Sequence, residues 1–363
     1  NGAVYARLAG SRCFVDWIAG DLQTIPRGAH QILAVAKQHK RRESLGWAHY
    51  LLSSVAYERN DLTTAEAHAT VAVEMRYLGR SIAYLQSAFI YASICQARGQ
   101  ADQAQRKIEM TFEFLSETHS EGLVPLAQAF QAEMAARQGD LGAARHWATT
   151  IGPFLPLTFM PYFYAPQLTL PKILLAQNTP ASRKKAAAAL SRLHNFVTST
   201  HNTRFTIEVL ALQALLHEAQ GDKPAALALL QQAVVLAEPG GFIRLFVDLG
   251  PQMASLLARL RQTGVLPDYT GQILQAVGES TPAALHSKAV ASAIDQTELV
   301  EPLTRRQYEI LTLLSQRLTN NEIAEALVIS PLTVKRHAAT IYQKLQVKGR
   351  REAVAKATRL GLL

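Results

Sequence analysis

The stretch TVKRHAATIYQKL, residues 333–345, places two basic side chains and a histidine on what reads as one short helix. With about 100° between successive residues, Arg336 falls at the centre of the polar face and Lys335 on its flank. A guanidinium at that place can reach the edge of a guanine base in the major groove, and flanking polar groups can hold phosphates. The same pattern also fits a solvated helix face, so the helix alone leaves both interpretations open.

The other side of this helix is apolar. Its members fall within about a third of the circumference and predict contact with a core. They are Val334, Ala338, Ile341, Tyr342 and Leu345. Small Ala339 lies near Arg336 on the polar face, where it permits close approach to a partner.

Three further short helices are expected around this one. LTRRQYEILTLLSQRL carries Thr304 as helix cap and Gln307 three residues on, and TNNEIAEAL repeats the arrangement with Thr319 and Glu322. Each pair fits a capping box. Ser330 before Pro331 predicts the start of the recognition helix, 331–345. A fourth helix, RREAVAKATRL, follows Gly349, so the order of elements predicts a helix-turn-helix.

The positive charge of the chain is concentrated at this end. The whole chain has a net charge of +9, and residues 301–363 contribute +6 of it, with eleven basic and five acidic residues. A concentrated basic region indicates a polyanionic partner.

The first 240 residues carry a repeat that must be explained separately. A turn residue recurs after an apolar helical stretch, at intervals of 40, 39, 40, 39 and 43 residues. The turn residues are Gly20, Asn60, Gly99, Gly139, Asn178 and Gly221. Gly and Asn tolerate the left-handed conformation that ends a helix, and the Asp or Thr that often follows can cap the next one. In four repeats an Ala stands five residues after the turn, where it lets paired helices approach closely: Ala65, Ala104, Ala144 and Ala226.

These features predict an all-α chain: a tetratricopeptide-like helical-repeat solenoid, followed by a four-helix helix-turn-helix domain. We expect the solenoid with its C-terminal cap over 1–262, a linker over 263–301 and the DNA-binding domain over 302–363. Within the solenoid, the Pro-rich segment IGPFLPLTFMPYFYAPQLTLP is expected to bend or loop. Its aromatic residues could line a ligand pocket or form interhelix core, and the candidate ligand-binding residues are Phe154, Phe159, Tyr162 and Tyr164.

The C-terminal segment resembles the DNA-binding domain of the LuxR family of bacterial regulators. The matching pieces include NEIA at 321–324, IS--TVK-H at 329–337 and I--KL-V at 341–347. The repeats, ending in GFIRLFVDLG, are similar to the helical sensor region of the large MalT-like subgroup. In that subgroup a nucleotide-binding domain precedes the repeats, and no G-x-x-x-x-G-K-[ST] motif occurs here. We therefore expect a sensor and DNA-binding fragment, or a shortened relative.

The resemblance assigns base reading to Lys335 and Arg336 and places a further contact of some members at Ala339, which offers no polar group. Departures from the family pattern at Asn321 and Gln307 bear on sequence preference. With the helical wheel, the resemblance gives two predicted sets of contacts. The base-reading set is Lys335, Arg336, Ala339 and Thr340. The phosphate set is Asn321, Ser330, Thr333, His337, Gln343, Lys344 and Lys348.

The expected function is a cytoplasmic regulator, favoured as an activator, that binds double-stranded promoter DNA and RNA polymerase as a dimer or oligomer. Its repeats would sense a small-molecule or protein inducer. An interaction scaffold with a non-specific basic tail is the alternative. We expect no enzyme activity, cofactor, metal site or membrane association, because no catalytic or metal-ligand cluster and no 18-residue apolar run is found. Cys13 and Cys95 have no metal-site spacing and are expected to be reduced.

Overall fold

The computed structural model describes residues 2–39, 42–76, 81–151, 157, 161–280, 305–316, 318–327, 330–345, 347 and 349–359. Every regular element in these ranges is a helix. The chain divides into two compact units, Asn1–Ala283 and Ala284–Leu363, each with its own apolar core. The predicted all-α fold is confirmed.

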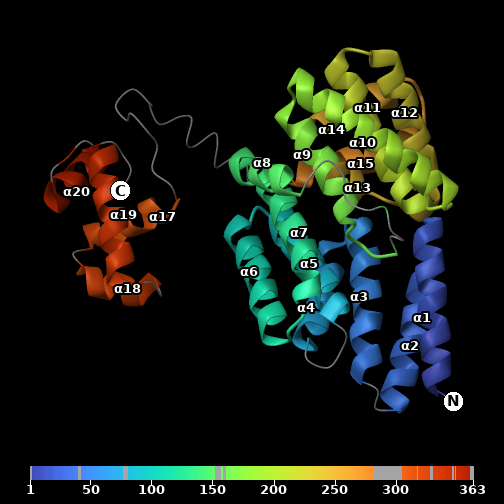
Figure 1. The fold of residues 1–363 in the computed structure, drawn as a ribbon, viewed down its shortest axis with the longest axis horizontal. Coiled ribbons are helices and arrows are strands. Elements are labelled where there is room, and N and C mark those ends of the chain that lie inside the picture. The colour runs from blue at the N-terminus through green and yellow to red at the C-terminus, as the bar shows by residue number, and fades with distance from the viewer. Residues whose placement is uncertain are drawn as a thin grey trace. The chain divides into compact units, whose positions relative to one another are not determined.

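The first unit contains successive antiparallel helix pairs, which follow one another from blue to yellow in Figure 1. The pairs are α1 (Gly2–Ala19) with α2 (Ile25–Gln38), α3 (Arg42–Glu58) with α4 (Leu62–Glu74), α5 (Ser81–Ala97) with α6 (Ala101–Glu117), α7 (Val124–Arg137) with α8 (Leu141–Thr150), α9 (Thr169–Gln177) with α10 (Pro180–Ser199), and α11 (Thr203–Gln220) with α12 (Lys223–Ala237). Short 3-10 turns occur at Glu121–Leu123, Pro166–Leu168 and Glu238–Gly240.

All six predicted turn residues adopt the left-handed conformation. The φ angles are 77° at Gly20, 65° at Asn60, 73° at Gly99, 87° at Gly139, 48° at Asn178 and 84° at Gly221. Each of them lies between the two helices of a pair, where the chain must reverse. The sequence repeat is therefore a structural repeat of helix hairpins.

After four of the six turns, the next residue caps the following helix, as the repeat predicts; no side-chain cap follows Gly20 or Gly99. Asp61, Asp140 and Asp222 each cap the following helix by accepting a hydrogen bond from a backbone N–H in its first turn. Thr179 does so within a reciprocal capping box with Ser182. The four repeat alanines, Ala65, Ala104, Ala144 and Ala226, are completely buried, which fits the close approach of paired helices.

After the last pair, α13 (Arg244–Val247), α14 (Pro251–Gln262) and α15 (Pro267–Ser280) close the unit. Here the structure differs from the expected linker over 263–301, because α15 lies inside that range and packs on the core. Tyr269, Ile273 and Ala276 form its buried side. Small and polar neighbours hide this apolar stripe in the sequence. The remainder of the range, 281–301, lies outside the described residues.

The end of the repeat array contacts its beginning. The backbone N–H of Ile243 donates to the carbonyl of Glu58 at 2.7 Å, and the Gln23 side chain donates to the carbonyl of Pro239 at 2.8 Å. A Cβ atom added at Gly240 would lie 2.5 Å from the carbonyl oxygen of Gly20, so only glycine fits there. The first and last repeats are therefore joined across the unit.

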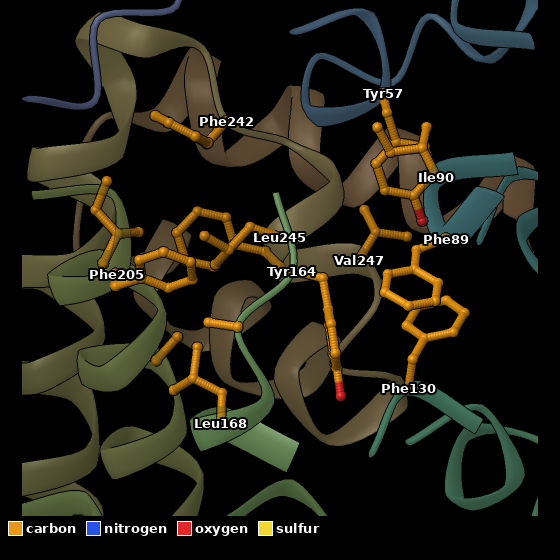
Figure 2. Packing of buried hydrophobic residues seen from close by; sticks show 14 of the residues in the cluster. Tyr57, Phe89, Ile90, Phe130, Tyr164, Leu168, Phe205, Phe242, Leu245 and Val247 are labelled. Carbon is orange, nitrogen blue, oxygen red and sulfur yellow. The ribbon is translucent and has the colours of Figure 1, made fainter. Parts of the chain in front are cut away.

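A continuous apolar core runs between the two halves of the array. In Figure 2, Tyr164 lies between Phe205 and Leu245 on one side and Phe89 and Phe130 on the other. Its ring meets those of Phe89 and Phe130 edge-on, at centroid distances of 5.3 and 5.1 Å. The segment that links the fourth and fifth repeats thus forms part of the core.

The second unit contains α17 (Arg305–Ser315), α18 (Asn320–Leu327), α19 (Pro331–Lys344) and α20 (Arg350–Arg359). Its core is built from one face of each helix. The fully buried members include Ile310 and Leu311, Ile323, Val334 and Ile341, and Ala353 and Ala357. The predicted apolar face of 333–345 is confirmed, with Tyr342 half-buried at its edge.

The contact between the first and last repeats predicts a specific sensitivity to substitution. Gly240→Ala places a methyl group against the carbonyl of Gly20 and the Phe242 ring. We expect a loss of about 1–3 kcal/mol in the unfolding free energy, as for other overpacked sites. The measurement is urea unfolding followed by tryptophan fluorescence, because Trp17, Trp47 and Trp147 all lie in this unit.

The matched control is Gly278→Ala. This glycine lies in α15, and an added Cβ meets nothing within 4 Å. It should leave the midpoint unchanged or raise it, because alanine favours helix over glycine. Equal midpoints for the two variants would contradict the contact between the repeat ends.

Candidate nucleic-acid interface and ligand cavity

The start of α19 is set by a side-chain cap. Ser330 Oγ accepts a hydrogen bond from the backbone N–H of Thr333 at 3.1 Å and lies 2.8 Å from the Thr333 hydroxyl. Pro331 occupies the first turn, as expected from the sequence. These contacts confirm Ser330 as the cap, while the phosphate contacts of Ser330 and Thr333 stay predictions.

The preceding helix, α18, starts with the predicted capping box. The Glu322 backbone N–H donates to Thr319 Oγ1 at 3.3 Å, and Thr319 returns its backbone N–H to Glu322 Oε2 at 2.6 Å. Hydrogen bonds from the Thr319 backbone and side chain lower the pKa of the Glu322 carboxyl. The other predicted box begins at Thr304, which lies outside the described residues.

Arg350 fixes the start of α20 to the end of α17 and the turn that follows it. Its guanidinium donates to the carbonyl of Leu314 at 2.7 Å and to that of Leu318, also at 2.7 Å. It therefore satisfies carbonyl groups at the end of α17 from the start of α20. Although basic, Arg350 serves the packing of the unit, because its donors are directed to the protein's own backbone.

The polar face of α19 is accessible. Lys335, Arg336, Ala339 and Gln343 are exposed, and Thr333, His337, Thr340 and Lys344 are half-exposed. The Thr340 hydroxyl donates to the carbonyl of Arg336 at 3.1 Å, one turn earlier. Asn321 is exposed in the first turn of α18, whereas Lys348 lies outside the described residues.

The two predicted base-reading cations have no acidic partner among the described residues. In the described ranges, no carboxylate forms a salt bridge with Lys335 or Arg336. The Glu322 carboxylate, in the preceding helix, accepts hydrogen bonds from Thr319. An exposed helix with unpaired cations at the centre of its face suits insertion into a groove lined by phosphates.

The predicted ligand residues of the first unit separate in the structure. Tyr164 is buried, hydrogen-bonds to Thr169 and lines a cavity of about 580 Å³. Tyr162 belongs instead to a half-buried aromatic cluster, in which it stacks on Trp47 at 6.3 Å between ring centroids. Phe154 and Phe159 lie outside the described residues.

The cavity is surrounded by helices from both halves of the array. Its lining comes from α3, α5 and α7 on one side and from α9, α11 and α13 on the other. Phe130, Phe163, Leu212 and Leu215 provide apolar wall. A cavity of this size, in which apolar wall alternates with charged side chains, is a candidate small-molecule site.

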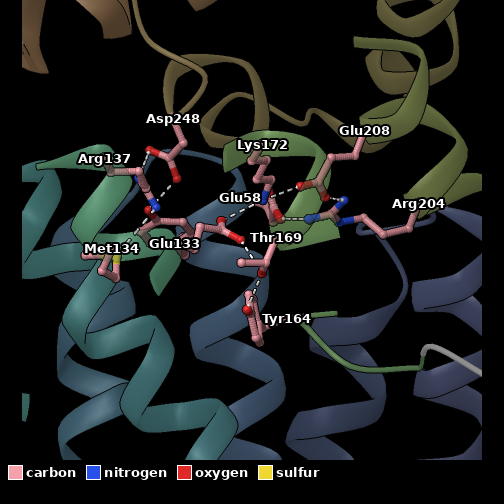
Figure 3. Close-up of polar contacts among 11 residues, drawn as sticks. Glu58, Glu133, Met134, Arg137, Tyr164, Thr169, Lys172, Arg204, Glu208 and Asp248 are labelled. Carbon is pink, nitrogen blue, oxygen red and sulfur yellow. Dashed lines mark hydrogen bonds and ion pairs between the residues drawn. The ribbon is translucent and has the colours of Figure 1, made fainter. Parts of the chain in front are cut away.

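Residues that line this cavity form a network of ion pairs, which Figure 3 shows. Arg204 donates to Glu58 at 2.7 Å and to Glu208 at 2.8 Å. Lys172 then joins Glu208, at 2.8 Å, to Glu133, at 2.6 Å. The network therefore links α3 and α7 to α9 and α11.

A second group of charges lies at the α13 side of the cavity. Asp248 accepts from Arg137 at 2.8 Å and from the Tyr57 hydroxyl at 2.7 Å, and it also pairs with Arg244. Burial alone would raise the pKa of Asp248, but Arg137 and Arg244 hold it below its usual value. This carboxylate joins α3, α7 and α13.

The two carboxylates around Arg204 differ in their surroundings. Glu208 is buried, but Lys172 and Arg204 lower its pKa to about 2. Glu58 has a raised pKa because burial outweighs the attraction of Arg204, and Glu208 adds repulsion. Of these two carboxylates, Glu58 is thus the one less compensated by positive charge.

No local motif in the sequence predicts this network, because its residues are spread from position 58 to position 208. One signal was present: Arg204 and Glu208 stand four residues apart and are the only charged residues in the mostly apolar TRFTIEVLALQALL of α11. Charges inside an apolar helix that is buried on several faces indicate an internal pair.

No helix in the described residues is long and apolar enough to cross a membrane. No group of three or more His, Cys, Asp or Glu side chains in the same residues is arranged to hold a metal ion.

Each of the two units matches the model of a known protein family. The MalT-like TPR region matches residues 17–263, and the bacterial regulatory proteins of the luxR family match residues 301–357.

Relatives along the chain agree with these matches. The HTH-type transcriptional regulator MalT of Vibrio parahaemolyticus is 25% identical over 291 residues, which cover 76% of this chain and 32% of that protein. MalT of Cronobacter sakazakii is 32% identical over 152 residues, 39% of this chain and 17% of that protein. MalT of Klebsiella pneumoniae is 32% identical over 163 residues, 42% of this chain and 18% of that protein.

The chain spans about a third of the length of the Vibrio relative. The family match over 17–263 covers more than half of the chain, and the hairpin repeats and the four-helix C-terminal unit fit the two matched regions. The chain therefore belongs to the MalT-like helical-repeat family and ends in a DNA-binding domain of the luxR family.

Proposed function

We propose that this chain is the sensing and DNA-binding part of a bacterial transcription activator. The observation that carries the proposal is the exposed face of α19, where Lys335 and Arg336 have no acidic partner among the described residues. The luxR-family match over 301–357 and the regulator names of the relatives support the same function. In this proposal Arg336 reads bases and the flanking polar groups hold the DNA backbone.

The repeat unit has the second role, the recognition of an inducer. Its support is the cavity of about 580 Å³, whose walls come from both halves of the repeat array. An occupant would contact α3 and α7 as well as α9 and α11, so its binding would change the contacts between the halves. Promoter DNA, RNA polymerase and a second copy of the chain are the macromolecular partners of this cytoplasmic regulator.

The proposed base contact predicts the effect of Arg336→Ala. A bidentate contact contributes about 1–3 kcal/mol to discrimination, so affinity for a preferred duplex should fall roughly 5- to 150-fold. The measurement is fluorescence anisotropy at fixed salt with duplexes selected by the wild-type chain from a random pool. Arg351→Ala is the matched control, because it removes an exposed arginine from α20 instead. Equal losses for both variants would contradict a groove contact by Arg336.

The proposed phosphate contacts predict a different signature. Lys344→Gln should weaken binding to preferred and unrelated duplexes alike and reduce the salt slope of the binding constant by about 1, because one fewer phosphate is neutralised. Titrations at several salt concentrations give the slope. An unchanged slope, or a loss confined to the preferred sequence, would remove Lys344 from the phosphate set.

A further inference from the structure

Glu58 and Arg204 face the cavity with hydrogen-bonding capacity that their own pair does not use. Glu58 Oε1 accepts from Arg204 at 2.7 Å, whereas the buried Oε2 has no hydrogen-bond partner. Arg204 uses both terminal nitrogens, on Glu58 and Glu208, and its buried Nε has no partner either. Both residues line the cavity, and their side chains are no more than 5% exposed.

An idle acceptor and an idle donor at this depth are costly for folding. A buried polar group without a partner loses its hydration and gains nothing in return. Unsatisfied buried groups in a cavity are therefore candidates for ligand contacts. The last torsion of a glutamate side chain is soft, so the Glu58 carboxylate can turn about it to present its covered Oε2 to a ligand donor.

The charges around the cavity are balanced. Four carboxylates line it, from Glu58, Glu133, Glu208 and Asp248, and four cations, from Arg137, Lys172, Arg204 and Arg244. A ligand with a net charge would disturb this balance in a largely buried site. A ligand that carries one charge of each sign keeps the balance and uses both idle atoms.

The rest of the wall favours an apolar body between those charges. Phe130 and Phe163 come from one side of the cavity, and Leu212 and Leu215 come from α11. The volume of about 580 Å³ is larger than one amino acid requires. It suits a chain of a few residues with small or apolar side chains.

We propose that this cavity binds a zwitterion with an apolar body, in the chemical class of a short peptide. Its ammonium group donates to Glu58 Oε2, and its carboxylate accepts from Arg204 Nε. The proposal rests on the sensing role of the repeat unit and specifies the chemistry of the inducer. It does not require any particular DNA sequence.

Calorimetric titration of the full chain with trialanine tests the proposal. The comparison probes are N-acetyl-trialanine, which keeps only the carboxylate, trialanine amide, which keeps only the ammonium group, and an uncharged trisaccharide of similar size. We expect saturable binding of trialanine, with affinity at least about tenfold above that of each comparison probe. Preferred binding of any comparison probe, or no binding of trialanine, would overturn the proposal.

Substitution then locates the contact. Glu58→Gln should weaken trialanine binding at least about tenfold, because a neutral amide attracts the ammonium group less. Glu66→Gln is the matched control. Glu66 lies on the neighbouring helix α4, where it forms a half-exposed ion pair with Arg98. Equal affinities for the two variants would contradict the assigned contact. The probe comparison on the wild-type chain remains decisive even if Glu58→Gln fails to fold.

DNA binding of the same preparations separates the two proposals. If the chain binds selected duplexes but not trialanine, only the ligand chemistry is wrong. If it binds trialanine but no duplex, the regulator function fails while the cavity assignment stands.

Discussion

The ion pair between Arg204 and Glu58 joins α11 to α3, and the two residues are 146 positions apart in the chain. It connects the last helical repeat to the second, next to the backbone contact from Ile243 to Glu58. Removing one partner from a buried pair costs about 3–5 kcal/mol, because the other charge is left uncompensated. The cavity exists because the two halves of the array meet around this network. The proposed sensing role therefore depends on it.

The two units manage their charges in opposite ways. In the repeat unit, cations such as Lys172 and Arg137 are partly buried and bound to carboxylates. In the C-terminal unit, Arg350 is bound to backbone carbonyls, while Arg336 remains exposed without an acidic partner among the described residues. A polyanion partner should therefore be inferred only from basic residues that are exposed and not bound to groups of the protein itself.

The local parts of this structure could be predicted from the sequence. A left-handed turn residue, a helix cap and a small residue at fixed spacing identify each hairpin, so Asn60, Asp61 and Ala65 mark their positions. Helical periodicity predicted the apolar face of α19. Thr319 and Ser330 predicted where α18 and α19 begin. These signals are local because each hydrogen bond or contact joins residues a few positions apart.

Long-range features could not be predicted in this way. The closeness of Gly240 to Gly20 depends on the summed rotation of six repeats, which no single turn reveals. Glu58 and Glu133 gave no sign of their role, because their partners lie on other helices. The stripe of Tyr269 and Ile273 in α15 was hidden among polar residues, and the segment was expected to be linker. The predicted DNA contacts stay predictions, since they require the nucleic acid itself.

The central claim is that the face of α19 reads a DNA sequence. It is tested most directly by sequencing the duplexes that the chain retains from a random pool, in parallel with Arg336→Ala. The account predicts a shared motif in paired half-sites, separated by about 10–10.5 base pairs or a multiple, as two copies on one face of the DNA require. It also predicts that the variant loses selectivity at one position of each half-site. Retention without any enriched motif, or the same motif at the same strength with the variant, would contradict it.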